Sequence, residues 1–147
     1  MPSGEQIVLL IRTSLLTLND ALKTGNFTVL RDIGAPGFRE ANTAARLSDT
    51  FANLRTQGVD LSAVAVLAPQ IVQAPTLQAN NMLHVKGFFP GQPVQINFEL
   101  LFVPTAGQWR LFGLAAAAVP SNGAGAPKAV APVQKDAPKK AAPPKTP

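Results

Sequence analysis

The segment from Val94 to Phe102 alternates large apolar side chains with Gln95, Asn97 and Glu99, which is the pattern of a β-strand with one buried face. Pro104-Thr105-Ala106-Gly107 then has the length and residue types of a hairpin turn, and residues 108–119 are predicted to return as the partner strand. Gly113 is expected to cause a bulge or bend there. A hairpin with one apolar face needs a second layer to cover that face.

The N-terminal part supplies that layer, because its apolar residues recur every three or four positions. Ser3 and Gln6 have capping-box spacing and Gly25 suits a left-handed C-terminal cap, so the pattern predicts a helix over residues 4–23. A short helix is predicted over residues 27–33. The next segment, Gly34-Ala35-Pro36-Gly37, is interpreted as a break between helices.

A third helix is predicted to begin at a cap formed by Asn42 or Thr43 and to end at Gly58. Residues 82–89 follow as a strand, and residues 71–77 as an extended segment interrupted by a proline. The predicted fold class is therefore α+β, with three N-terminal helices packed on one face of an antiparallel sheet.

The net charge of +5 belongs mainly to the C-terminal end. Residues 1–120 contain eight basic and seven acidic side chains, whereas residues 121–147 contain five lysines and Asp136. Six prolines and few large apolar residues predict that residues 121–147 form a disordered Lys/Ala/Pro-rich tail behind a folded domain of residues 1–120. The tail is expected to contact an anionic envelope surface or to act only as a solubilising extension. Its dispersed lysines do not predict specific nucleic-acid binding.

The residue inventory argues against most cofactor and metal chemistry. The chain has no cysteine, one histidine and dispersed carboxylates, so we expect no disulfide and no metal site. The glycines at 34 and 37 lack the Lys-Ser/Thr that follows a phosphate-binding loop, and no cofactor is expected. The apolar run from Leu111 to Pro120 has about half of the roughly 20 residues that a membrane-spanning helix needs.

Three segments resemble parts of a known family. They are Gly25-Asn26-Phe27 after the long helix, residues 51–61 at the end of the third helix, and Gly107-Gln108-Trp109-Arg110-Leu111 in the hairpin. Over about residues 4–119 the chain resembles a bacterial member of the nuclear transport factor 2-like superfamily, which has a cystatin-like fold. The resemblance implies a curved sheet wrapped around the long helix, a cone that holds an apolar ligand, and homodimers formed through the outer sheet face. It implies no single activity.

Two sets of apolar residues are the candidate sites. Phe51, Phe98, Phe102 and Trp109 are candidates for an apolar pocket, with plain core packing as the alternative. On the opposite face, a second set is predicted to form an exposed patch that a two-fold dimer buries. This dimer face consists of Leu101, Val103, Phe112 and Leu114.

These observations predict a dimeric, non-catalytic binding module that holds a small apolar ligand. The alternative is a proton-transfer enzyme of the isomerase or dehydratase type that uses Asp20 or His84. Against it, the inward side chains of the best strand are inert, the chain has no tyrosine, and His84 is expected to point outward beside Lys86. Unchanged turnover of a substrate by Asp20→Asn and His84→Ala variants would eliminate this alternative.

The compartment is predicted from the two ends of the chain. The sequence has no basic leader segment and begins almost directly at a helix cap, as a processed domain would. Low charge and the Ala/Pro/Lys tail suit an exported bacterial protein. An exported or periplasmic location is therefore favoured over the cytoplasm.

Overall fold

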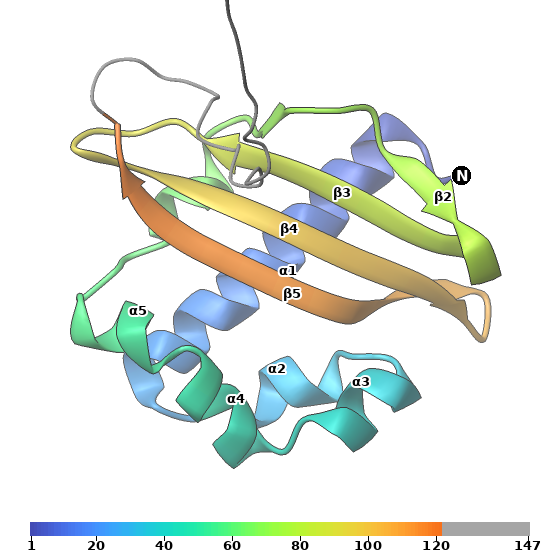
Figure 1. The fold of residues 1–147 in the computed structure, drawn as a ribbon, viewed down its shortest axis with the longest axis horizontal. Helices are drawn as coiled ribbons and strands as arrows, with labels where there is room; N and C mark the ends of the chain where they lie inside the picture. The colour runs from blue at the N-terminus through green and yellow to red at the C-terminus, as the bar shows by residue number, and fades with distance from the viewer. Residues whose placement is uncertain (122–147) are drawn as a thin grey trace, which may run out of the picture.

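The computed structural model describes residues 1–121. Helices occupy the N-terminal half and a five-stranded antiparallel sheet the C-terminal half, so the predicted α+β class with helices on one sheet face is confirmed (Figure 1). The tail predicted for residues 121–147 lies outside the described residues, apart from Ser121.

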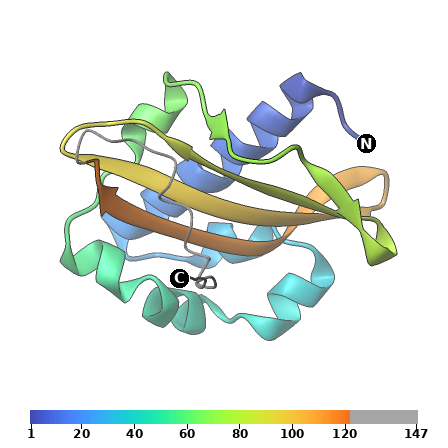
Figure 2. The same cartoon turned by 45° about the horizontal axis from the view of Figure 1, so that its top comes forward.

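Helix α1, Gly4–Thr24, is the long helix that the sequence predicts. Its capping box is present, since the Ser3 hydroxyl accepts from the Gln6 amide at 3.2 Å and the Gln6 side chain accepts from the Ser3 amide at 2.9 Å. Gly25 closes the helix with φ 78°. The helix crosses one face of the sheet (Figures 1 and 2), and Leu15 is fully buried there.

The remaining helices are more numerous than predicted: α2 Thr28–Asp32, α3 Pro36–Ala41, α4 Ala44–Thr50 and α5 Ala52–Thr56. Helix α3 begins where a break was expected, because Pro36 occupies its first turn, where the missing amide costs nothing. The predicted third helix is capped by Thr43 but divides at Phe51, whose φ of −104° and ψ of 17° leave the helical region. Packing of this buried ring overrides the local helix preference.

A short 3-10 helix, η1 Ser62–Ala65, leads from the helices to the sheet. The strands are β1 Gln70–Ile71, β2 Thr76–Gln78, β3 Met82–Phe89, β4 Val94–Thr105 and β5 Gln108–Pro120, with a short 3-10 turn, η2 Ala79–Asn81, between β2 and β3. Strands β1 and β2 both pair with β3 along one edge, and the order continues through β4 to β5 at the other edge. The extended segment expected over residues 71–77 is thus two short strands on either side of Pro75.

Strands β4 and β5 form the predicted hairpin around Ala106 and Gly107, which have φ of 51° and 81°. Their register shifts between Leu101 and Phe102, so β5 carries a bulge beside Gly113. The buried side chains of β4 cover α1, as the alternation predicts, but Val94 is exposed.

Four arginines connect the helices to their surroundings through main-chain carbonyl groups. Arg12 donates to the carbonyls of Val64 and Leu67 at 3.1 and 2.7 Å, and Arg55 donates to Leu22 at the end of α1 at 3.1 Å. The other two arginines act in the same way around α3. Arg31 donates to the Asn42 carbonyl and Arg39 to the Gly34 carbonyl.

Candidate functional site

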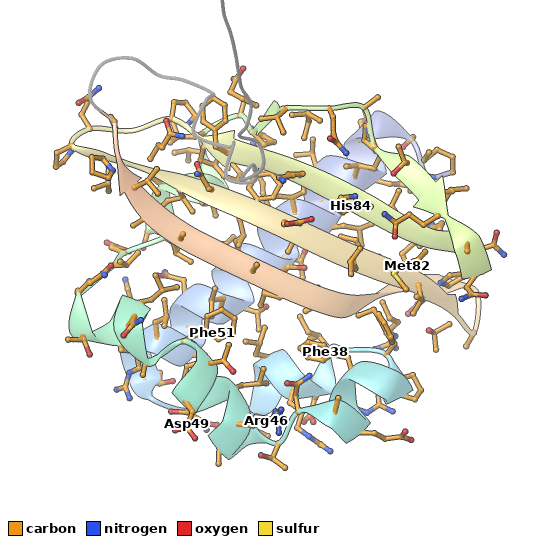
Figure 3. The ribbon with its side chains drawn as sticks, in the orientation of Figure 1. Phe38, Arg46, Asp49, Phe51, Met82 and His84 are labelled. Carbon is orange, nitrogen blue, oxygen red and sulfur yellow. The ribbon has the colours of Figure 1, made fainter. Side chains whose placement is uncertain are left out.

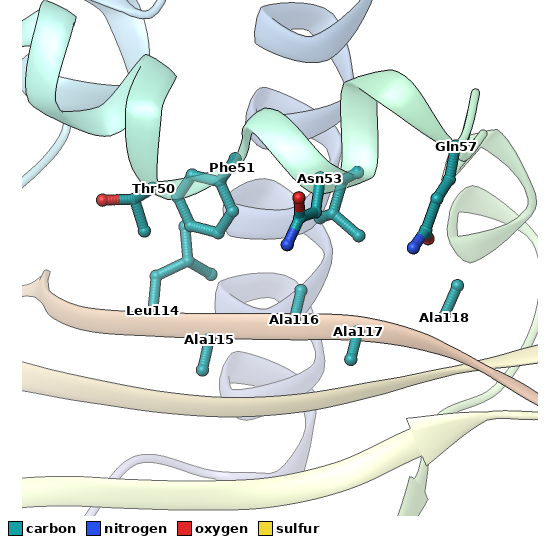
Figure 4. A pocket seen from close by; sticks show the side chains of 10 residues that line it. Thr50, Phe51, Asn53, Gln57, Leu114, Ala115, Ala116, Ala117 and Ala118 are labelled. Carbon is teal, nitrogen blue, oxygen red and sulfur yellow. The ribbon is translucent and has the colours of Figure 1, made fainter.

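A groove of about 340 Å³ lies between helices α4 and α5 and strand β5 (Figure 4). Its volume is in the lower part of the range of small-ligand sites. Ten residues line it: Thr50, Phe51, Asn53, Leu54, Gln57, Leu114, Ala115, Ala116, Ala117 and Ala118.

The groove follows the edge of β5 rather than one face of the sheet. All residues from Leu114 to Ala118 contribute to it, although neighbouring side chains of a strand point to opposite faces. In Figure 4, Leu114, Ala116 and Ala118 point toward the helices, whereas Ala115 and Ala117 point away. A cavity lined by both sets must lie beside the strand.

This edge of β5 is largely unpaired within residues 1–121. Strand β5 is the last strand of the sheet, and its outer edge is bridged only near Leu111, whose carbonyl accepts from the Ala35 amide at 2.8 Å. Beyond that bridge, the outward backbone groups of residues 114–118 have no partner strand in the described chain. Such an edge is a template for another extended segment.

The helix side of the groove combines an apolar floor with neutral polar groups. Phe51 and Leu54 are buried beneath it. The Thr50 hydroxyl donates within α4 to the Arg46 carbonyl at 2.9 Å. The side-chain amides of Asn53 and Gln57 are exposed, point toward β5 and bond no other described side chain or backbone group (Figure 4). No lining residue is titratable, so the groove suits an uncharged ligand that offers apolar and hydrogen-bonding groups.

The structure separates the four residues proposed for the apolar pocket. Phe51 lines the groove, and its ring stacks on Phe27 with centroids 6.4 Å apart. Phe98 and Phe102 are buried in the core at 3% and 1% exposure and do not line the groove. Trp109 is half-buried near the hairpin turn, opposite Pro104.

The four residues proposed for the dimer face do not share one face. Leu101 and Val103 lie half-buried on the outer face, but Leu114 pairs with the fully buried Leu100 and lines the groove on the helix side. Phe112 lies against Gly37 of α3. The bulge is the cause, because one extra residue reverses which side chains of β5 point inward.

His84, one candidate for proton transfer, lies on the outer face of β3, away from the helices (Figure 3). Its Nε2 lies 2.6 Å from a carboxylate oxygen of Glu99 on β4, a partner that lies 15 positions away and that the local sequence does not indicate. Neither residue lines the groove. Asp20, the other candidate, is exposed on α1 and is also absent from the groove lining.

Asp60 is the acidic group whose environment is most clearly perturbed. Its carboxylate accepts from the Ser62 hydroxyl at 2.6 Å and from the Ser62 amide at 3.0 Å, and Lys23 lies 3.5 Å away. The hydrogen bonds from Ser62, with a smaller contribution from Lys23, lower the pKa of Asp60 below its usual value. Its stabilising contribution is therefore present above the pKa of the unfolded chain and is lost as pH falls through the folded pKa. This contact fixes the start of η1 and is remote from the groove.

Within the described part of the chain, no three histidine, cysteine or acidic residues gather to hold a metal ion. Among residues 1–121, no helix has the length and hydropathy needed to cross a membrane. Comparison of the chain with protein-family models, curated proteins and solved structures gives no match. The resemblance to the nuclear transport factor 2-like superfamily therefore stays a prediction from the sequence.

The sequence does contain a signal for the groove. Four consecutive alanines, Ala115 to Ala118, occupy β5 beside the helices. Larger residues at Ala116 and Ala118 would fill the space between the strand and the helices. The small side chains leave room beside the strand.

Proposed function

We propose that this domain is a non-catalytic binding module whose binding site is the groove beside β5. The observation that carries the proposal is the combination of an uncharged lining with an unpaired strand edge. The backbone edge offers hydrogen bonds, Phe51 and Leu54 offer apolar contact, and the lining holds no group that moves protons near neutral pH. Binding is therefore favoured over proton transfer as the role of this site.

Filling the groove from the helix side tests this proposal. Asn53→Phe places a ring into the groove from an exposed helix position, whereas Ala52→Phe changes the neighbouring exposed residue that does not line it. With the neutral apolar dye Nile red as probe, Asn53→Phe is expected to weaken binding at least about fivefold, the loss of roughly 1 kcal/mol. Ala52→Phe is expected to bind as the unaltered protein does. Equal dye affinity for both variants and the unaltered protein would contradict the proposal.

We also propose that two copies associate through the outer sheet face. Leu101 and Val103 lie there with Met82 and Phe88 of β3, all partly exposed, around the His84–Glu99 pair. Burying this partly apolar face against a symmetric copy removes it from water. The face is smaller than the sequence predicted, because Phe112 and Leu114 belong to the helix side.

Sedimentation equilibrium at micromolar concentration tests the association. The unaltered chain is expected to have the mass of two copies, and Leu101→Glu the mass of one, because it places a carboxylate beside Glu99 in a desolvated interface. Val29→Glu, an exposed position on α2, is the matched control and is expected to leave the dimer intact. A single-chain mass for the unaltered protein would exclude the dimer.

Contact of the tail with an anionic envelope surface stays a prediction from its composition.

A further inference from the structure

We infer that the groove binds an extended segment of this chain's own C-terminal tail, residues 129–133, as an added strand on β5. This inference rests on the proposed function, since it names the occupant of the same groove. Three independent requirements of the groove support it: a backbone template, an uncharged surface and a short distance to the end of β5.

The backbone requirement comes from the edge of β5. Along an antiparallel edge strand, the N–H and C=O groups of alternate residues point outward. Residues 114–118 carry such groups beside a cavity instead of a neighbouring strand. An extended segment satisfies them by strand addition, and its other edge then meets the side-chain amides of Asn53 and Gln57 (Figure 4).

The side-chain requirement selects one stretch of the tail. The groove has no charged lining residue, and the alanines of β5 leave room for small or β-branched side chains. Between Lys128 and Lys135 the tail reads Ala129-Val130-Ala131-Pro132-Val133-Gln134, which is uncharged and holds the only two valines after β5. Pro132 lacks an amide hydrogen. An edge strand tolerates a proline where the proline nitrogen faces away from the neighbouring strand.

The connection is long enough for the same chain to reach the groove. The Ser121 amide donates to the Pro93 carbonyl at 2.9 Å, which fixes the end of β5. The groove residues Ala118 to Leu114 precede Ser121 on the same strand by about 10 to 23 Å at roughly 3.3 Å per residue. The connection of residues 122–128 is long enough for residues 129–133 to return antiparallel to β5, and it includes Asn122-Gly123, a pair that favours chain reversal. A tether of this length gives an effective concentration on the order of 1 mM.

Amide hydrogen exchange measured by NMR on the full chain tests the docking. In the unaltered protein, the backbone amides of residues 114–118 that point away from β4 are expected to be protected from exchange by the docked segment. In Val130→Asp/Val133→Asp the exchange of these amides is expected to be at least about tenfold faster. The uncharged groove does not accommodate two carboxylates, so the added strand detaches. Lys139→Ser/Lys140→Ser changes the same tail without altering the docking segment and is expected to leave exchange unchanged. Protection of buried amides in α1 confirms that each variant is folded.

Equal exchange of these amides in the unaltered protein and in Val130→Asp/Val133→Asp would overturn the inference. Protection that increases with protein concentration would also overturn it, because the occupant would then be the tail of a second copy. Nile red separates this failure from failure of the groove itself. A docked tail competes with the dye, so Val130→Asp/Val133→Asp is expected to bind it at least about tenfold more tightly, because the same docking equilibrium determines the amide protection and the competition. If only the tail inference fails, this variant binds the dye as the unaltered protein does, while Asn53→Phe still weakens binding.

Discussion

Phe27→Ala is expected to lower the free energy of unfolding by about 3–5 kcal/mol, the cost of replacing a fully packed phenylalanine by alanine. Phe27 is 1% exposed, and its ring stacks on Phe51 with an interplanar angle of 2°. Because Phe51 lines the groove, the cavity left by this change removes the support beneath the binding site as well. Urea denaturation followed by circular dichroism measures the stability.

Val29→Ala is the matched control, since Val29 lies two positions further along and is 61% exposed. Its stability is expected to stay within about 0.5 kcal/mol of the unaltered protein. If Phe27→Ala lowered the free energy of unfolding by less than about 1 kcal/mol, far below the usual cost of such a truncation, the ring pair would not hold the helices against the core. For any Phe27→Ala protein that stays folded, we expect weaker Nile red binding, because Phe51 can tilt into the vacated space.

Asn19→Ala is expected to cost about 2 kcal/mol, because it leaves a buried backbone amide without an acceptor. Asn19 is 4% exposed on α1; its side-chain oxygen accepts from the Leu61 amide at 2.9 Å, and its amide nitrogen donates to the Ser62 hydroxyl at 3.2 Å. This one side chain joins the long helix to the segment that begins η1. The measurement is again the free energy of unfolding in urea.

Asp20→Ala tests the adjacent position, which is exposed on the same helix. We expect it to be neutral or slightly stabilising, since an acidic residue near the C-terminal end of a helix is disfavoured by the helix dipole. If Asn19→Ala were as stable as Asp20→Ala, the junction between α1 and η1 would not depend on this buried amide.

Local signals predicted the elements that depend on neighbouring residues. The capping box at Ser3, the left-handed glycine at position 25 and the alternation in β3 and β4 each correspond to the observed element, because each is a short-range preference. The sequence pattern does not predict helix α3, because its proline and glycine resemble a break, although proline suits a first helical turn. The division between α4 and α5 at Phe51 has no local sequence signal. The Phe51 ring packs on Phe27, a residue distant in the sequence, so neighbouring residues do not indicate the division.

The groove and the outer face depend on register, which a single sequence does not display. Gly113 predicts the bulge, but the sequence does not show that the bulge reverses the direction of every later side chain of β5, which places Leu114 on the helix side instead of the outer face. Glu99 on β4 contacts His84 on the neighbouring strand β3 diagonally, because the register places Glu99 directly opposite Lys86. The edge position of β5 likewise follows from the strand order.

The arginine contacts around the helices make unequal demands on their two partners. Arg12, Arg31, Arg39 and Arg55 all donate to backbone carbonyls. Every residue carries a backbone carbonyl whatever its side chain. A substitution at an acceptor position therefore keeps the acceptor, whereas a substitution of the arginine removes the donor.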